Sequence, residues 1–332
     1  MLVRALAVLI ACLLSTPAWA QAEEAEAPPA DEPVFSFAVL PIPPLAVYGV
    51  AAYENVPLGD WKQAFHARGG YVWTTNYVHD PKTRRRQLLH PEQTSDFWHL
   101  IADWGVQPTR EWAWLIDGYL AGGGLSQTPG YDQALTQGVS ATFGPALRYS
   151  TLDAMAFPTR GTNAQANWAP GYHWGAESLA FQRVSLDAMH FLPLGADRTI
   201  AMRAVGKAAW PKLAWVDKFY AGGGFFLRGY EWNRFTGDRL LSGTLEYRDL
   251  FLPDMFAPFG LDLGMDIGLA YHAFADVGRA WEGEGGVAFP ADLRYGAGTG
   301  LMLMLDRVPV GRLEVSVGDE GIFPAASFGT AF

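Results

Sequence analysis

The chain has 332 residues, of which 50% are hydrophobic, 14% aromatic and 17% charged, whereas soluble domains carry about 25% charged residues. Its formal net charge of −10 argues against nucleic acid as a partner, because phosphate binding needs a basic surface. No run of about 18 uncharged apolar residues follows the N-terminus, which excludes helical membrane spans.

Residues 1–20 are predicted to be a secretory signal peptide. Arg4 provides the basic start, an apolar stretch follows, and an Ala-Trp-Ala sequence ending at Ala20 forms the small-residue cleavage site. We expect cleavage after Ala20, with lipoprotein processing at Cys12 as the alternative. Cys12 is the only cysteine, so cleavage after Ala20 would exclude disulfides and cysteine chemistry from the mature protein.

The next segment, residues 21–33, reads QAEEAEAPPADEP. It is acidic, rich in Pro and Ala and without periodicity, which predicts a disordered tail. No comparable linker follows, so residues 34–332 are predicted to form one domain.

Apolar and polar residues alternate repeatedly along residues 34–332, which is the periodicity of β-strands. Between 239 and 251, for example, Leu245 and Phe251 fall on one face, and Glu246 and Arg248 on the other. Fourteen strands are predicted, and twelve and sixteen are the alternatives, because bacterial single-chain barrels have an even number of strands. The predicted strands are 34–41, 45–54, 63–76, 97–107, 110–121, 137–151, 161–169, 177–191, 197–210, 239–251, 263–281, 293–305, 311–317 and 325–332.

Full charges in the middle of the polar strand faces distinguish two all-β architectures. A soluble β-sandwich would expose such charges and bury the apolar face, whereas a membrane barrel turns the apolar face to lipid and lines its interior with charges. Together with the signal peptide, this pattern favours an antiparallel transmembrane β-barrel, since lipid leaves closed barrels as the only β-structure that can span it. The charges are Arg203, Lys207, Glu246, Asp276 and Arg294.

Four motifs occur in an order that resembles one family. The segment 217–235, DKFYAGGGFFLRGYEWNRF, lies between two predicted strands and contains Leu227, Arg228, Gly229 and Tyr230. It resembles the inward-folded sixth extracellular loop of the BamA/TamA superfamily of outer-membrane assembly and translocation barrels, also called bacterial surface antigens. The other three motifs are FPTRGT at 157–162, which is similar to a periplasmic turn of that family, FADVG at 274–278, which is similar to a strand motif, and the C-terminal ASFGTAF.

The C-terminal motif resembles the assembly signal of outer-membrane barrels, which implies roles for Phe328, Gly329 and Phe332. The family resemblance is good over 140–332 and weak over 34–139. Family members with assembly or secretion roles carry polypeptide-transport-associated (POTRA) domains before the barrel, whereas here only the acidic tail is expected there. The chain is therefore similar to a barrel-only branch without POTRA domains.

The resemblance implies that the long loop folds into the barrel lumen and places Arg228 against its wall. Asp276 and Glu246 lie on the predicted polar faces of their strands and are the expected partners, because a guanidinium holds a carboxylate through two parallel hydrogen bonds. The loop glycines Gly222, Gly223 and Gly224 permit backbone angles that other residues disfavour.

The sequence shows no catalytic motif, metal-ligand spacing or cofactor fingerprint, so we expect no enzyme activity, metal or cofactor. The resemblance implies a location in the outer membrane of a Gram-negative bacterium and a role in inserting or moving polypeptide or lipid. The implied partners are outer-membrane lipid and lipopolysaccharide, the barrel assembly machinery during biogenesis, and a client polypeptide or separate periplasmic protein. The alternatives are a passive pore or structural barrel, and an outer-membrane lipid hydrolase without a visible catalytic set.

Overall fold

The computed structural model describes most of the predicted barrel domain. The expected signal peptide, the acidic tail, and the C-terminal Phe328, Gly329 and Phe332 lie outside the described residues. The described residues are 34–40, 45–58, 60–75, 77–79, 86–88, 94–125, 137–154, 157–224, 226–231, 234–260, 264–283 and 293–327.

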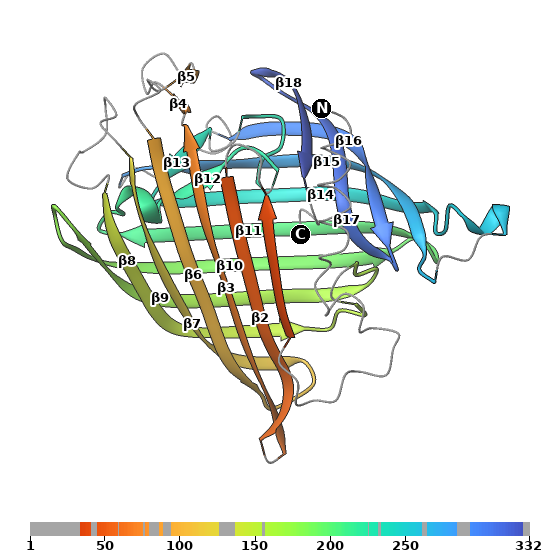
Figure 1. Cartoon of the computed structure of the whole chain (residues 1–332), viewed down its shortest axis with the longest axis horizontal. Helices are drawn as coiled ribbons and strands as arrows, with labels where there is room; N and C mark the ends of the chain where they lie inside the picture. Colours follow the sequence, from red (N-terminus) through yellow and green to blue (C-terminus); the bar gives the residue numbers. More distant parts are fainter. Residues whose placement is uncertain are drawn as a thin grey trace. The chain divides into compact units, whose positions relative to one another are not determined.

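Within this part of the chain, fourteen strands form one antiparallel sheet, in which each strand pairs with the strand of the sheet that follows it in the sequence (Figure 1). The strands are β1 (Val34–Leu40), β2 (Leu45–Leu58), β3 (Trp61–Thr75), β6 (Thr94–Gln107), β7 (Trp112–Leu125), β8 (Gln137–Ser150), β9 (Gly161–Gly175), β10 (Leu179–Pro193), β11 (Arg198–Trp210), β14 (Arg239–Leu252), β15 (Ile267–Trp281), β16 (Arg294–Leu305), β17 (Val308–Gly318) and β18 (Gly321–Ser327). Each predicted strand thus has a counterpart in the sheet.

The connections contain short elements that no alternation predicted, because three residues are too few to show a period. Strand β4 (Tyr77–His79) pairs with β5 (Arg86–Leu88), and β12 (Phe219–Ala221) pairs with β13 (Phe235–Gly237). Two 3-10 helices are also described, η3 (Trp215–Asp217) and η4 (Ala257–Phe259). No helix in the described ranges is long and apolar enough to cross a membrane.

The last strand differs from its prediction. The sequence predicted 325–332, whereas β18 begins at Gly321. Strands β17 and β18 pair directly across a tight turn, with Gly318 opposite Gly321, so pairing starts at the turn. Alternation did not reveal this start because Pro324 interrupts the pattern.

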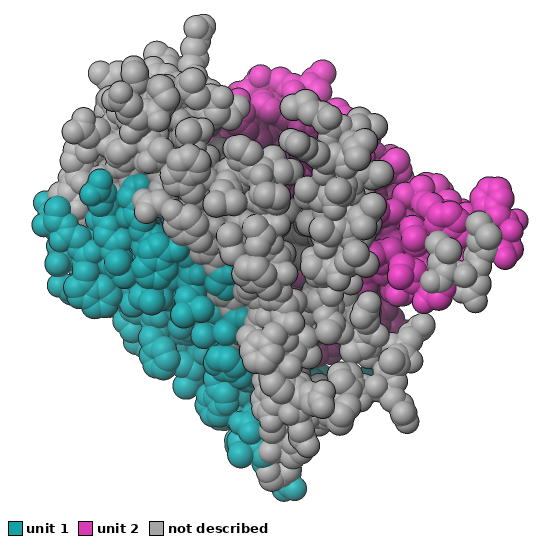
Figure 2. All heavy atoms as spheres, viewed as in Figure 1, with its two compact units in different colours: residues 1–147, 167–184, 209–218 teal, residues 148–166, 185–208, 219–332 magenta. Residues whose placement is uncertain are grey.

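The chain forms two compact units, each built from several sequence segments (Figure 2). One comprises residues 1–147, 167–184 and 209–218, and the other comprises 148–166, 185–208 and 219–332. In the first unit, Ala113, Leu115 and Ala146 form a buried apolar cluster. In the second, Phe157 of the FPTRGT turn packs among Leu250, Ala270, Met302 and Met304.

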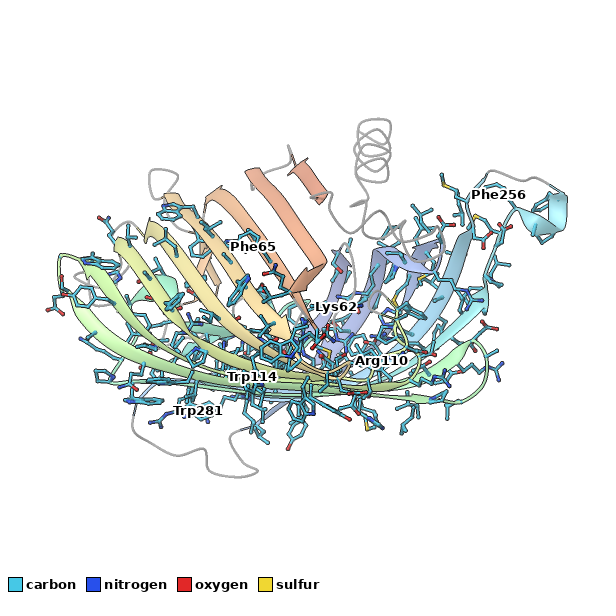
Figure 3. All side chains as sticks on the ribbon, turned by 90° about the horizontal axis from the view of Figure 1, so that it is seen from below. Lys62, Phe65, Arg110, Trp114, Phe256 and Trp281 are labelled. Carbon is cyan, nitrogen blue, oxygen red and sulfur yellow. The ribbon has the colours of Figure 1, made fainter. Side chains whose placement is uncertain are left out.

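The two faces of the strands have opposite chemistry, as the alternation predicted. On β14, Glu246 and Arg248 are 1% exposed, whereas Leu245 and Phe251 are 51% and 53% exposed. Trp114 and Phe65 are likewise exposed on β7 and β3 (Figure 3). A protein whose charges are buried and whose aromatic side chains face outward presents the surface that a lipid environment favours.

We expect a lipid-soluble thiol probe to label Leu245→Cys but not Ser242→Cys in protein reconstituted in a bilayer. Leu245 lies on the exposed face of β14, and Ser242 is 4% exposed on the opposite face. Cys12 is the only native cysteine, which limits background labelling. Phe251→Cys is the positive control on the same face. Labelling of Ser242→Cys but not Leu245→Cys would contradict the assigned register, since a one-residue slip exchanges the faces.

Candidate functional site

The segment between β11 and β14 folds back on itself through its glycines. The Gly222 N–H donates to the Phe226 carbonyl at 2.8 Å, and the Gly223 N–H to the Tyr230 carbonyl at 3.2 Å. Gly222 and Gly223 adopt φ of 113° and 87°, values that favour glycine. These glycines therefore allow the tight turn that presents Arg228.

Asp276 on β15 holds the Arg228 guanidinium through two parallel hydrogen bonds. Nε of Arg228 donates to Oδ2 of Asp276 at 2.8 Å, and Nη2 donates to Oδ1 at 2.9 Å. The Arg228 backbone N–H also donates to Oδ2 at 2.8 Å. This carboxylate therefore fixes both the side chain and the main chain of the loop.

Two further carboxylates contact the same guanidinium. Nη1 of Arg228 donates to Oε2 of Glu246 on β14 at 2.6 Å, and to Oε1 of Glu314 on β17 at 3.3 Å. The guanidinium lies 3.4 Å from the ring centroid of Phe274, and Arg228 is 3% exposed. The loop is thus anchored to three strands of one sheet through charge-assisted hydrogen bonds, which are stronger than neutral ones.

These contacts also determine the protonation of Arg228. Burial by itself lowers the pKa of Arg228, but the hydrogen bonds and charge of Asp276, together with the charge of Glu246, raise the pKa above its ordinary value. The guanidinium is therefore a permanent charge at this position.

Two more guanidinium groups complete the cluster. Nε of Arg248 donates to Oε1 of Glu246 at 2.8 Å, and Nε of Arg312 lies 3.2 Å from Oε1 of Glu314. Arg312 Nη2 donates to the Gly224 carbonyl at 3.0 Å. We call the following six residues the anchor cluster: Arg228, Arg248, Arg312, Glu246, Asp276 and Glu314. Their three positive and three negative charges balance, which reduces the cost of burying them.

Additional contacts hold the loop against β16 and the β17–β18 turn. Tyr230 is 3% exposed, and its hydroxyl donates to the Tyr295 carbonyl at 3.1 Å. Arg234 donates from Nε and Nη2 to the two carboxylate oxygens of Glu320, both at 2.7 Å. A Cβ added at Gly229 would lie 2.7 Å from the Val317 carbonyl oxygen, so this close approach requires glycine.

The structure brings the sequence-predicted loop residues together with Asp276 and Glu246. It adds Glu314, Arg248 and Arg312, which sequence reasoning did not name as partners. A signal for Glu314 was present, since Arg312, Glu314 and Ser316 alternate with apolar residues and therefore share the buried face. Which of these buried charges contacts the loop depends on strand register, which the alternation does not determine.

A second buried polar cluster, in the other unit, was not predicted. Ser140 on β8 donates from Oγ to Oδ2 of Asp217 in η3, and its Oγ lies 2.8 Å from Nδ1 of His173 on β9. Among the described residues, Oδ1 of Asp217 and Nε2 of His173 have no hydrogen-bond partner. Burial raises the pKa of Asp217 to about 6, although the Ser140 hydrogen bond and the charge of Arg183 oppose this rise.

Ser, His and Asp are the residue types of a nucleophilic triad, but their arrangement here differs from one. In a triad the His lies between the nucleophile and the acid, whereas here Ser140 lies between His173 and Asp217. All three residues are at most 2% exposed, so a substrate could not reach them in this conformation. The cluster is better explained as a structural contact of η3.

The raised pKa of Asp217 predicts a pH-dependent stability. The folded state favours the protonated carboxyl, so this contribution is fully present below the unfolded pKa of about 3.9 and is lost as pH rises through about 6. We expect Asp217→Asn to raise the melting temperature at pH 8, by an effect of up to about 3 kcal/mol, and to leave it nearly unchanged at pH 4.

Thermal unfolding at pH 4, 6 and 8 measures this dependence. Asp187→Asn is the control, because Asp187 accepts two hydrogen bonds from Arg203 and its replacement should lower the melting temperature at pH 8. A lower melting temperature of Asp217→Asn than of the wild type at pH 8 would contradict the prediction.

The fold and the loop motif lead to a family assignment. The Omp85 superfamily domain matches residues 70–320 of the chain. The chain belongs to the Omp85 superfamily. The resemblance drawn from the loop, turn and strand motifs is thereby confirmed, and Omp85 membership implies an outer-membrane location.

Solved structures of BamA and CdiB proteins share the fold at low sequence identity. BamA from Haemophilus ducreyi lacking POTRA domains 1–3 has a TM-score of 0.55 and 12% identity, covering 89% of this chain and 62% of that one. CdiB from Acinetobacter baumannii has a TM-score of 0.51 and 12% identity, and the match covers 90% of this chain and 51% of that one. CdiB from Escherichia coli has a TM-score of 0.52 and 13% identity, and the match covers 89% of this chain and 55% of that one.

These comparisons establish the fold class of this Omp85 protein. The chain spans between about half and two thirds of the length of these structures. No curated protein sequence matches it. The predicted all-β, antiparallel barrel fold is confirmed, with fourteen strands in the described sheet. The long loop is held against the buried face of that sheet. In the described ranges, no group of three or more His, Cys, Asp or Glu side chains is arranged to bind a metal ion.

Proposed function

We propose that this protein is a non-enzymatic outer-membrane barrel that assists the insertion or passage of polypeptide or lipid. In this mechanism, the loop between β11 and β14 that carries Arg228 blocks the barrel lumen while it is docked and opens it when it detaches. The observation that supports it is the anchor cluster, which holds the loop to three strands almost entirely through charged groups.

The chemistry of this attachment favours a loop with two states. Apolar packing would hold a purely structural loop at least as stably, because replacing a buried ion pair with apolar residues is often neutral or stabilising. Charged groups, unlike apolar ones, are solvated by the water that enters the lumen when they separate. A cluster of balanced charges therefore suits a contact that forms and breaks.

A passive pore or structural barrel is the second candidate. It is favoured by the contacts that fasten the loop outside the anchor cluster, namely Arg234 with Glu320 and Tyr230 with Tyr295. In this mechanism the loop stays docked and braces the wall.

The cellular setting belongs to the same proposal. The signal peptide is removed after Ala20, and the mature barrel resides in a Gram-negative outer membrane, in contact with lipid and lipopolysaccharide. The barrel assembly machinery inserts it, and a client polypeptide or a separate periplasmic protein is its working partner. Its C-terminal Phe328, Gly329 and Phe332 serve as the assembly signal.

Depletion of the protein followed by quantitative outer-membrane proteomics and lipid analysis tests this function. Selective loss of other barrels or of an outer-membrane lipid, restored by the wild-type gene but not by Arg228→Ala, would support it. An unchanged outer membrane, combined with steady conductance of the purified protein in planar bilayers, would overturn it in favour of the passive barrel.

A further inference from the structure

His272 on β15 is a buried ionisable group beside the anchor cluster. Its side chain is 0% exposed. Nδ1 lies 3.8 Å from Oε2 of Glu246, and Nε2 lies 3.7 Å from Oε1 of Glu314. Among the described residues, neither ring nitrogen has a hydrogen-bond partner. The imidazole thus lies between two carboxylates, within ion-pair distance of each when it is protonated.

The same two carboxylate oxygens contact Arg228. Nη1 of Arg228 donates to Oε2 of Glu246 and to Oε1 of Glu314, the oxygens nearest the two nitrogens of His272. Arg228 and His272 therefore approach the same pair of acceptors, Arg228 from the loop and His272 from the wall. When one of these side chains withdraws, the other is already in position.

Charge balance distinguishes the docked loop from the released loop. With the loop docked, the anchor cluster contains three guanidinium groups and three carboxylates, whose charges balance. Withdrawal of Arg228 leaves two guanidinium groups, on Arg248 and Arg312, against three carboxylates, which is an uncompensated buried negative charge. One proton on His272 would restore neutrality.

Charged side chains of three strands and of the loop surround His272 in the described part of the chain. The facing charges are Glu246 and Arg248 on β14, Asp276 on β15, Arg312 and Glu314 on β17, and Arg228 on the loop. Strand β16 faces the ring with Gly300, where an added Cβ would lie 2.6 Å from Nε2 of His272. Phe274 stacks against the ring with centroids 5.8 Å apart.

We propose that His272 is a proton-linked substitute for Arg228. When the loop withdraws, His272 takes up a proton from hydronium in the solvent that enters, leaving neutral water, and holds Glu246 and Glu314 in place of the guanidinium. Loop release is therefore coupled to proton uptake and is promoted by acid. This control goes beyond the proposed function, because it concerns loop docking whether or not a polypeptide or lipid crosses the barrel.

Hydrogen–deuterium exchange of the loop measures this coupling directly. The Arg228 N–H donates to Asp276, and the Gly222 and Gly223 N–H groups bond within the loop, so their protection reports docking. The full chain in lipid nanodiscs is compared between pH 7.5 and 5.5, with rates corrected for intrinsic chemical exchange. Coupling to one proton predicts that loop protection falls by up to about tenfold per pH unit.

His272→Gln is expected to lose this dependence and keep only the part that protonation of the carboxylates contributes. His190→Gln is the matched control, because His190 is bonded to Thr162 elsewhere in the same unit, and it should behave like the wild type. Equal pH dependence of loop protection in the wild type and in His272→Gln would overturn the proposal.

A second measurement does not rely on exchange. The melting temperature of Arg228→Ala should approach that of the wild type as pH falls from 7.5 to 5.5, because protonated His272 replaces the missing charge. The difference in melting temperature between His272→Gln and the double variant Arg228→Ala/His272→Gln should not become smaller over the same pH range. The proposal would also be overturned if the difference in melting temperature between Arg228→Ala and the wild type stayed constant from pH 7.5 to 5.5.

Discussion

Replacing Arg228 with Ala is expected to destabilise the protein by about 3–5 kcal/mol, the usual cost of breaking a buried ion pair by removing one partner. The substitution leaves Asp276 without its two parallel hydrogen bonds and leaves the anchor cluster with an excess negative charge. The melting temperature and the resistance of the loop to protease should both fall at neutral pH.

Two comparisons make this prediction specific. Arg198→Ala removes an ion pair with Asp249 whose Arg side chain is 61% exposed, and it should cost at most about 1 kcal/mol. Arg228→Ala combined with Asp276→Ala should cost less than the sum of the single variants, because each single change leaves the other partner's charge unpaired. Wild-type melting temperature and loop protection in Arg228→Ala would show that the loop is not anchored through this side chain.

Gly296→Ala is expected to displace the loop without removing any charge. An added Cβ at Gly296 on β16 would lie 1.7 Å from the Arg228 carbonyl oxygen. The obstructing atom belongs to the backbone, so no side-chain rotation relieves the overlap. Overpacking of this kind typically costs about 1–3 kcal/mol and occasionally more, and here it acts directly on the docked loop.

Gly206→Ala provides the matched control, because nothing lies within 4 Å of an added Cβ at that position on β11. Protease resistance of the loop and the melting temperature should fall in Gly296→Ala and stay close to wild type in Gly206→Ala. Similar behaviour of the two variants would mean that the loop does not approach β16 as closely as described.

Alternation of apolar and charged residues was sufficient to predict the strands and their faces. On β14, Leu245 was assigned to the apolar face and Glu246 to the polar one, and they are 51% and 1% exposed. The period of two residues fixes these faces because large apolar side chains predominate on the exposed side of the described strands. Strand ends were less predictable, as β18 shows, because a turn rather than a pattern defines where pairing begins.

The two-residue alternation alone could not predict which residues of the anchor cluster contact one another. Asp276 and Glu246 were named as partners of Arg228 by combining strand faces with family resemblance. Glu314 lies 86 residues from Arg228, and only the pairing of β15, β16 and β17 brings it to the same place. The Ser140–His173–Asp217 cluster likewise joins three distant segments, and none of their local sequences marks it.

The positions of the Arg228 partners along the chain have a consequence for biogenesis. Glu246, Asp276 and Glu314 follow Arg228 by 18, 48 and 86 residues, and Glu314 belongs to β17, the penultimate strand of the described sheet. The complete set of contacts can form only after nearly all strands have been added, and such long-range contacts form slowly. An intermediate that lacks β17 lacks the loop contacts made by Glu314 and Arg312. The loop is therefore fully attached only once β17 has joined the sheet, which makes complete docking a late step of folding.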